Sequence, residues 1–433
     1  MSDGNTGAKI AIIGAGSFVF SLGLLSDLIV DYRLRGSHLV LVDIDEEMAG
    51  IMARIATRMA DDAQVEMTIE STSDRETALR GVQFVTTSVA IQLLRRYAMD
   101  REVLRRHGIR EITCECGGVG GLSYALRAIP LIMGIARDME RLCPEAWLLN
   151  VSNPLPRVIT AVTRHTCIRA LGFCNCAHGG YGGFANVARL LGYEMRDLNV
   201  TSAGLNHFSW LLGVRDRWSG EDLLPRVQAL LDARQWEAYH RLTGQWWRQY
   251  RLWSLAGDTH AGEYFPFDPA DGREEIAHHG NAEERAARRC ELQEAAAGQR
   301  PWQSLMGGRA WERPAEVIHA LLTGTRRRMD MVNLPNRGAI AGLPDDAVVE
   351  VPALVTNGEV RGVPVGAMPD SIAGYLAQVS AAHTAVAEAA VHGDRALIEE
   401  AIRIDPAITE KVAAVQAIDE LLHVHADVLP QFA

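Results

Sequence analysis

Two short segments in the middle of the chain carry side chains that could hold a metal ion. Cys174 lies in G-F-C-N-C-A-H (172–178), and His207 lies in G-L-N-H-F-S-W (204–210). One thiolate and one imidazole are suitable ligands for a divalent cation, and they leave its other coordination positions open to a substrate. Both residue types are also common in apolar cores, so the pair alone leaves a packing role open. It indicates metal-assisted chemistry only if a cofactor or substrate site lies beside it.

Glycine and acidic residues near the N-terminus indicate such a cofactor site. Gly14 and Gly16 stand between a predicted strand and a predicted helix, where the backbone can approach a pyrophosphate. Ser17 and Phe18 complete the turn G-A-G-S-F, which lacks the third glycine of the full fingerprint. Asp43 ends the next predicted strand, where an acid accepts the ribose hydroxyls and disfavours a 2′-phosphate. These residues predict NAD rather than NADP, against the alternative of a glycine turn and a helix cap without a ligand.

The elements that must position these residues alternate along the first half of the chain. Apolar runs predict strands at 9–14, 38–45, 83–90 and 146–151, and helical periodicity predicts helices near 19–32, 94–107 and 122–141. Such alternation is typical of α/β proteins with a doubly wound parallel sheet of the Rossmann type.

After about residue 200 the pattern becomes mixed. Helices are predicted within 222–256, 280–299 and 371–425, and two short strands within 347–365. A chain of 433 residues also exceeds the size at which one hydrophobic core usually stops growing. We therefore expect an NAD-binding domain over residues 1–200 and a mixed α+β lobe that binds substrate and metal over residues 201–433.

Composition excludes several classes of function. A net charge of −11 opposes binding to nucleic acid phosphates. The chain has no run of 18 apolar residues and no apolar N-terminal stretch, so neither a membrane span nor secretion is predicted. Four of the seven cysteines form two C-x-C pairs, which fit free thiols in a reducing compartment. We expect a cytoplasmic protein that acts on a small molecule.

Several motifs, taken in their order along the chain, resemble one enzyme family. They are G-x-G-S at 14, N-V-S-N-P at 150, G-F-C at 172, G-L-N-H at 204, D-T-H-A-G-E-Y-F-P at 258 and V-N-L-P-N-R-G-A-I-A-G-L-P-D-D-A-V-V-E-V-P at 332. Together they are similar to the NAD- and metal-dependent glycosidases of glycoside hydrolase family four, which depart from the usual two-carboxylate mechanism. The resemblance covers essentially the whole chain and implies a fold like that of lactate and malate dehydrogenases.

The resemblance also implies roles for particular residues. The cofactor contacts would be Gly14, Gly16, Ser17, Phe18 and Asp43; the ligands of the metal, typically manganese, Cys174 and His207; the sugar contacts Asn153, Asn175, Asn206 and Arg95; and the catalytic candidates Glu115, Asp258, His260 and Tyr264. Glu115 would be the general acid, and either Asp258 or Tyr264 the base. Asn175 departs from the family, which usually has a His directly after the metal-binding Cys, and Glu115-Cys116 departs from its usual acid loop.

The implied reaction is a glycoside cleavage that is redox-neutral overall. NAD⁺ would oxidise C3 of the sugar, the base would remove the C2 proton, and the aglycone would leave by elimination with a proton from Glu115. Water would then add before the hydride returns to C3. An unphosphorylated α-linked glycoside or glycuronide is the expected substrate, and a homodimer or homotetramer the expected assembly. Two alternatives remain: a sugar or 2-hydroxy-acid dehydrogenase with net NADH formation, and a cofactor-bound scaffold without catalysis.

Overall fold

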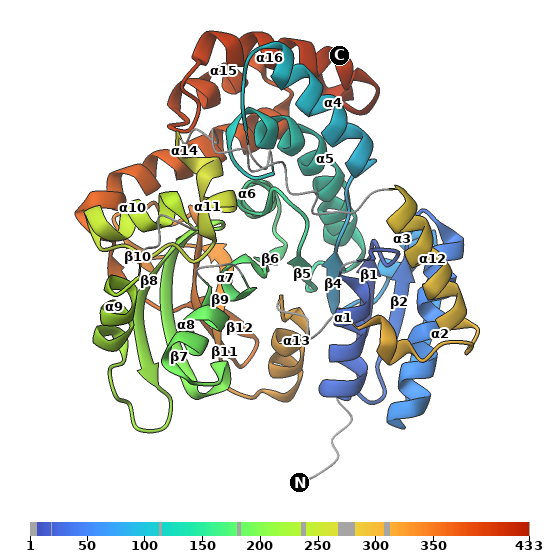
Figure 1. Ribbon diagram of the computed structural model, residues 1–433. Coiled ribbons are helices and arrows are strands. Elements are labelled where there is room, and N and C mark those ends of the chain that lie inside the picture. Colours follow the sequence, from blue (N-terminus) through green and yellow to red (C-terminus); the bar gives the residue numbers. More distant parts are fainter. Residues whose placement is uncertain are drawn as a thin grey trace.

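One sheet runs through the whole molecule. The computed structural model describes residues 7–18, 20–111, 115–179, 183–234, 240–266, 282–306 and 312–432. Eleven strands of this described part join in the order β3-β2-β1-β4-β5-β6-β9-β11-β7-β8, with β12 paired to β11, and β10 pairs separately with β13 (Figure 1). The strands are β1 (Lys9–Ile13), β2 (His38–Val42), β3 (Thr68–Thr72), β4 (Phe84–Thr87), β5 (Trp147–Asn150), β6 (Arg169–Gly172), β7 (Leu198–Leu205), β8 (Phe208–Asp216), β9 (Arg327–Pro335), β10 (Ile340–Ala341), β11 (Val348–Thr356), β12 (Glu359–Gly362) and β13 (Gly366–Ala367).

The helices flank this sheet on both faces. They are α1 (Ser21–Ser26), continued by the π-helical η1 (Asp27–Asp31), α2 (Glu46–Ala63), α3 (Arg75–Leu79), α4 (Leu93–Arg106), α5 (Gly118–Leu142), α6 (Leu155–His165), α7 (Cys176–Gly179), α8 (Phe184–Leu191), α9 (Leu224–Asp232), α10 (Arg241–Tyr250), α11 (Gly257–Ala261), the 3₁₀ turn η4 (Gly262–Tyr264), α12 (Ala282–Ala296), α13 (Pro314–Thr323), α14 (Asp370–His392), α15 (Arg395–Ile404) and α16 (Lys411–Val424).

The first six strands are parallel and follow the doubly wound order 3-2-1-4-5-6. In β1 the side chains alternate between two cores. Ile10 and Ile12 pack with α1 and α2, whereas Ala11 and Ile13 face the core that α5 shares with the C-terminal helices. A strand covered on both faces must be apolar throughout, which is why these strands appear as unbroken apolar runs in the sequence. The predicted parallel sheet is confirmed.

The sheet continues into an antiparallel half. β9 lies between β6 and β11, and β11 lies between β9 and β7, so residues from the end of the chain are inserted between β6 and β7. One row of residues crosses four of these strands, because Gly172 pairs with Asn333, Asn333 with Glu350, and Glu350 with Gly204. The sheet therefore does not end at residue 200, and the division into an NAD-binding domain at 1–200 and a substrate- and metal-binding domain at 201–433 stays a prediction.

A layer of helices covers one face of the parallel half. Figure 1 shows α14, α15 and α16 stacked with α4, α5 and α6. Helix α5 is apolar and long enough to cross a membrane by length and composition, but 83% of its most apolar window is buried inside the protein. It is thus the central core helix of this layer.

Most of the elements predicted from periodicity are present, with shifts of a few residues at their ends. The hairpin β7–β8 and the strands β3, β6 and β9 were not predicted. Only residues 198–201 alternate between buried and partly buried positions and most of the remaining hairpin is buried, so the period-two strand pattern is weak. This hairpin matters because its turn carries His207.

Candidate active site

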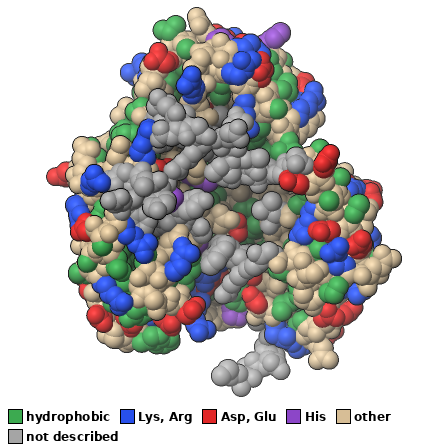
Figure 2. Space-filling view, viewed as in Figure 1, with side chains coloured by type: hydrophobic (Ala, Val, Ile, Leu, Met, Phe, Trp, Pro, Cys, Tyr) green, Lys and Arg blue, Asp and Glu red, His purple; other side chains and the backbone are tan. Residues whose placement is uncertain are grey.

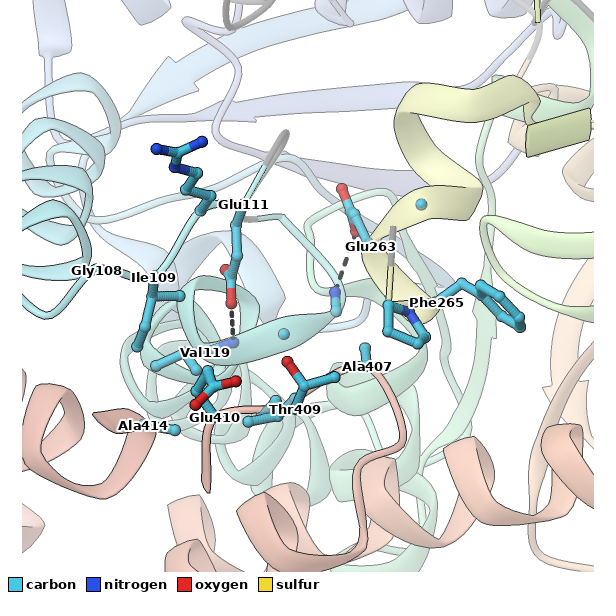
Figure 3. A pocket seen from close by; sticks show the side chains of 16 residues that line it. Gly108, Ile109, Glu111, Val119, Glu263, Phe265, Ala407, Thr409, Glu410 and Ala414 are labelled. Atoms are coloured by element: carbon cyan, nitrogen blue, oxygen red, sulfur yellow. Dashed lines mark hydrogen bonds between the residues drawn. The ribbon is translucent and has the colours of Figure 1, made fainter. Parts of the chain in front are cut away.

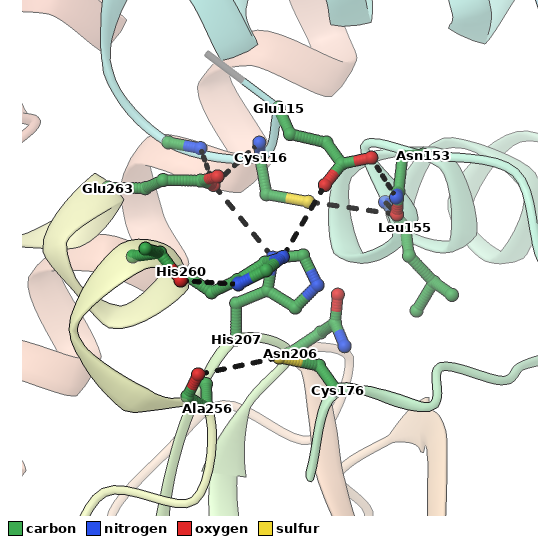
Figure 4. A network of polar contacts seen from close by, with 12 residues as sticks. Glu115, Cys116, Asn153, Leu155, Cys176, Asn206, His207, Ala256, His260 and Glu263 are labelled. Carbon is green, nitrogen blue, oxygen red and sulfur yellow. Dashed lines mark hydrogen bonds and ion pairs between the residues drawn. The ribbon is translucent and has the colours of Figure 1, made fainter. Parts of the chain in front are cut away.

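The residues selected from the sequence gather at one edge of the sheet. Gly14 follows β1, Asn153 follows β5, Cys174 follows β6, and His207 lies in the turn between β7 and β8. The carboxyl ends of parallel strands are where ligands bind in doubly wound folds. Glu115 and the segment of α11 and η4 approach the same place from outside the sheet (Figure 4).

The turn after β1 has the shape expected for a pyrophosphate cradle. Gly14 has φ +85°, and a Cβ there would lie 2.2 Å from the carbonyl oxygen of Ser88. The Gly16 N–H donates to Oδ2 of Asp43 at 2.8 Å, and a Cβ on Gly16 would lie 2.9 Å from that oxygen. Only glycine allows this close approach of backbone to backbone and to the acid. The turn therefore fits a dinucleotide.

The two residues after these glycines are also placed in the turn. Ser17 accepts a hydrogen bond from the Phe20 N–H at 3.3 Å through its hydroxyl. Phe18 is half-buried, and the guanidinium of Arg285 in α12 lies 4.9 Å from its ring centroid. The hydrogen bond from Gly16 connects Asp43 to the glycine turn. The contact with Arg285 connects Phe18 to a helix that is distant in sequence.

Cys174 and His207, 33 residues apart in sequence, meet at the end of β6. The Sγ of Cys174 lies 3.4 Å from Nε2 of His207. His207 has φ +63°, and a Cβ on the nearby Gly204 would lie 2.2 Å from the carbonyl oxygen of Phe208, so the tight hairpin turn requires the G-L-N-H sequence. A separation of 3.4 Å lets both atoms bind one cation at the usual distances of about 2.1–2.3 Å. The donor set therefore fits a divalent metal.

The buried carboxylate of Glu350 binds the residue next to His207. Oε2 of Glu350 accepts hydrogen bonds from Nδ2 of Asn206 at 2.8 Å and from Nδ2 of Asn333 at 3.1 Å. Burial raises the pKa of Glu350 above its ordinary value and also raises the pKa of the Cys174 thiol, to which Glu350 contributes. Asn206, predicted to contact sugar, thus binds the carboxylate beneath the metal pair. Glu350 was missed, although an acid inside the apolar run V-V-E-V-P is itself a signal of a buried charge.

Glu115 stands above the pair in a desolvated position. Its Oε1 accepts a hydrogen bond from Nδ2 of Asn153 at 2.6 Å, and its Oε2 lies 4.0 Å from Nε2 of His260. Burial and the nearby Glu263 raise the pKa of Glu115, while His207 and Asn153 lower it. The carboxyl group therefore retains its proton to a higher pH than an exposed glutamate, which suits a proton donor.

Glu263 is a second buried carboxylate that the sequence did not single out. Its Oε2 accepts hydrogen bonds from the backbone N–H groups of Cys116 at 2.8 Å and Gly117 at 3.1 Å. The same oxygen lies 3.9 Å from Nδ1 of His207, and both side chains are 2% exposed. The rings of His207 and His260 meet edge to face at 4.5 Å. Glu263 thus links the loop of Glu115 to the imidazole of the metal pair (Figure 4).

The two candidate bases have different surroundings. Asp258 accepts hydrogen bonds from the N–H groups of Leu242 and Thr243, both at 2.9 Å, and from the Thr243 hydroxyl at 2.7 Å. Its carboxylate thereby holds the N-terminus of α10. The hydroxyl of Tyr264 is fully buried and has no hydrogen bond within the described part of the chain. Burial raises the pKa of Tyr264 well above its ordinary value, and Arg157 lowers it.

The remaining predicted sugar contacts lie farther out. Asn175 is exposed, and its carbonyl oxygen accepts the N–H of His178 at 2.9 Å. Arg95 is exposed on α4 and donates to Oε1 of Gln92 at 3.0 Å. The structure therefore joins Asn153 and Asn206 to the centre, but it does not bring Arg95 into contact with the described residues there.

Other thiols lie close enough to His207 to extend the donor set. Cys176 with His207 and His260, and Cys116 with His207 and Glu263, each place three donor atoms within 4.8 Å of one another. The thiol of Cys176 lies 3.8 Å from the carbonyl oxygen of Ala256. His207 is common to both groups and to the Cys174 pair, whereas the third donor group of the described residues, His165 with Glu388 and His392, does not include it.

The fold and this centre define a class of protein: an enzyme with a dinucleotide-type sheet and a thiol–imidazole metal pair at its carboxyl edge. The chain belongs to glycosyl hydrolase family 4. The model of that family matches residues 9–190, and the model of the family's C-terminal domain matches residues 202–408. The resemblance inferred from the motifs is confirmed, and the protein is a glycosyl hydrolase.

Relatives of full length have several activities. An alpha-glucosidase of Erwinia rhapontici is 29% identical, with 96% of this chain and 97% of the relative covered. A "Probable 6-phospho-beta-glucosidase" of Bacillus subtilis is 32% identical, with 98% of each chain covered. The family is therefore certain, whereas the relatives differ in sugar, anomer and phosphorylation.

Solved structures show the same fold. A Bacillus subtilis structure described as a glucosidase has a TM-score of 0.83 at 26% identity over 96% of this chain and all of that chain. A 6-phospho-alpha-glucosidase from gut microorganisms in complex with NAD and Mn²⁺ has a TM-score of 0.81 at 24% identity, with 98% and 100% covered. A lactate dehydrogenase from a deep-sea metagenome has a TM-score of 0.54 at 11% identity over 89% and 99%. The dehydrogenase-like fold is thus confirmed.

Proposed function

We propose that the protein is an NAD- and divalent-metal-dependent glycosidase whose reaction leaves the cofactor unchanged overall. The observation that carries this proposal is a connected cluster at the carboxyl ends of the strands, where the Gly14 turn also lies. The Cys174 thiol lies 3.4 Å from His207, the His207 ring packs on that of His260, and His260 lies 4.0 Å from the carboxyl group of Glu115. A metal pair, a proton donor and a dinucleotide cradle at one edge are the groups that cleavage through a transient ketone needs.

The geometry of the site and its similarity to family members indicate the two cofactors. The cradle of Gly14, Gly16 and Asp43 would hold NAD, and Cys174 with His207 would hold the cation, with manganese as the first choice. The gut 6-phospho-alpha-glucosidase of the same fold, which contains NAD and Mn²⁺, supports both assignments. When bound, the two supply reversible hydride transfer at C3 of the sugar and acidification of the C2 proton.

Glu115 is the proton donor in this proposal. Its raised pKa keeps the proton on the carboxyl group to a higher pH than in an exposed glutamate, and the amide of Asn153 fixes the direction of that group. Because Oε1 is occupied by Asn153, Oε2 on the side of His260 is the oxygen that faces a leaving group. Asn153 therefore acts on the sugar indirectly, by orienting the acid.

Tyr264 is the base, and Asp258 is a helix cap. Both oxygens of Asp258 are already occupied by main-chain and hydroxyl donors of α10, whereas the Tyr264 hydroxyl is unpaired among the described residues and lies near Glu263 and Cys116. Only the ionised phenolate is a base, and a raised pKa makes this form scarce. The activity of Tyr264 as a base therefore depends on positive charge nearby. Arg157, which lowers the pKa of Tyr264, supplies part of that charge.

An unphosphorylated α-linked glycoside or glycuronide is the proposed substrate. The acidic side chains described around the metal pair, Glu115, Glu263 and Glu350, offer no positive charge to a phosphate dianion. Figure 2 shows acidic and basic side chains interspersed on the face in view, consistent with a small-molecule partner. We also propose a cytoplasmic homodimer or homotetramer, which light scattering after size exclusion would test.

A single assay tests the proposed function. The purified protein is incubated with NAD⁺, Mn²⁺ and a panel of aryl glycosides, with and without 6-phosphate, and aglycone and NADH are measured together. We expect aglycone release without accumulation of NADH. NADH formed in proportion to substrate consumed would instead support a net dehydrogenase and overturn the proposal.

A further inference from the structure

The two ring nitrogens of His207 face different partners. Nε2 lies 3.4 Å from Sγ of Cys174, and Nδ1 lies 3.9 Å from Oε2 of Glu263. An imidazole that binds a metal through one nitrogen is usually oriented by a carboxylate or carbonyl at the other. The placement of Glu263 on the Nδ1 side therefore matches an orienting group rather than a ligand of a cation at Nε2.

We propose that Glu263 is a positioning residue that fixes the imidazole of His207 for metal binding and, through the same carboxylate, fixes the main chain next to Glu115. This inference rests on the proposed metal site at Cys174 and His207. The buried side chain of Glu263 would thereby set the distance between the metal pair and the proton donor Glu115.

The carboxylate is itself held rigidly. It accepts the N–H groups of Cys116 and Gly117 at 2.8 and 3.1 Å, at the start of α5. A Cβ on Gly117 would lie 2.2 Å from the carbonyl oxygen of Glu263, so the backbones of these two segments are in direct contact. Because Glu263 is 2% exposed in its side chain, it cannot move toward solvent without leaving two buried donors unpaired.

Glu263 also has the acceptor capacity that the proposal needs. Its Oε1 has no hydrogen bond among the described residues. The present 3.9 Å separation from Nδ1 is longer than a hydrogen bond, so the contact is electrostatic. A small rotation of the imidazole when Nε2 binds a cation would bring the Nδ1 proton onto the carboxylate.

Glu111 provides a matched control. Its Oε1 accepts the Val119 N–H at 2.6 Å and its Oε2 accepts the Gly120 N–H at 2.8 Å, so it binds the same end of α5 as Glu263. Figure 3 shows both acids at a cavity of about 420 Å³ beyond that helix end. Of the two acids, Glu263 is the one with a described contact to His207.

The experiment compares Glu263→Gln and Glu111→Gln with the wild type by titrating the metal-free proteins with Mn²⁺ in a calorimeter. We expect Glu263→Gln to weaken Mn²⁺ binding about 10- to 100-fold, the usual effect of losing such an orienting partner, and Glu111→Gln to leave it unchanged. Equal binding by Glu263→Gln and wild type, or equal weakening by both variants, would overturn the inference. A wild type that binds no divalent ion would instead refute the proposed function.

A measurement on the wild type keeps the inference testable if Glu263→Gln does not fold. The protein is labelled with ¹⁵N-histidine, loaded with ¹¹³Cd²⁺, and the His207 ring is assigned by its loss in His207→Gln. We expect the ¹¹³Cd coupling at Nε2 and the proton at Nδ1. Coupling at Nδ1 would overturn the inference, since the metal would then lie on the side of Glu263.

Discussion

Replacement of Asp258 tests whether its carboxylate acts as a helix cap or as the catalytic base. The residue is 4% exposed, and its carboxylate binds two main-chain N–H groups and one hydroxyl of residues 242 and 243. In Asp258→Ala the N–H groups of Leu242 and Thr243 would be buried without an acceptor. In Asp258→Asn one oxygen remains to accept, and the side chain keeps its size.

The expected loss of stability follows from these contacts. Two buried donors without an acceptor cost about 2–6 kcal/mol together. An unfolding entropy of about 2.1 cal/mol/K per residue corresponds to about 0.9 kcal/mol/K for 433 residues. We therefore expect Asp258→Ala to lower Tm by about 2–7 °C and Asp258→Asn by less. Thr243→Val, which removes only the hydroxyl, should lower Tm by about 1 °C.

Calorimetry and steady-state kinetics of the same preparations complete the test. Below the Tm of each variant, we expect Asp258→Asn to keep kcat within about tenfold of the wild type, because removal of a general base costs about 10²–10⁴. A variant with wild-type Tm and a kcat lowered by a hundredfold or more would refute the capping role and restore Asp258 as the base.

Three further outcomes are expected. Cys174→Ser should lose its divalent ion on dialysis, as measured by elemental analysis, because the serine hydroxyl is a much weaker ligand; full retention would contradict the metal pair. Arg157→Met should destabilise the protein by about 3–5 kcal/mol in urea, since it leaves Asp405, 3.6 Å from the guanidinium and buried, without its charge partner, and adding Asp405→Asn should recover part of this loss. Burial and Arg157 hold the pKa of His383 well below its ordinary 6.5. Below pH 6.5 the unfolded chain therefore binds a proton at His383 that the folded protein does not bind. The free energy of unfolding should fall as the pH is lowered through that range, and in His383→Leu the urea concentration at the unfolding midpoint should depend less steeply on pH.

The sequence was most informative where the chemistry is local. The turn of Gly14 and the G-L-N-H segment are recognisable because each depends on neighbours within a few residues: a left-handed backbone at Gly14, and a hairpin turn at His207 that only Gly204 allows. The meeting of Cys174 with His207 could be predicted because both follow motifs of one family.

The supporting acids could not be placed in the same way. Glu263 binds the main chain at Cys116, 147 residues earlier, and Glu350 binds Asn206, 144 residues earlier. An acid in an apolar run indicates a buried charge, but its partner depends on how distant strands and loops pack. The role of Asp258 stayed open for the same reason, since only the folded chain shows that its oxygens are occupied.

The insertion of β9 and β11 between β6 and β7 has a consequence for synthesis of the protein. While the ribosome has released only the residues before 327, β6 and β7 have no strand to join them, and Cys174 and His207 belong to segments without a common support. The metal pair can form only after residue 356 has emerged, when both inserted strands are available. A chain that ends before residue 356 therefore lacks the strands that hold the metal pair together, and it presents two unpaired strand edges that chaperones would have to protect.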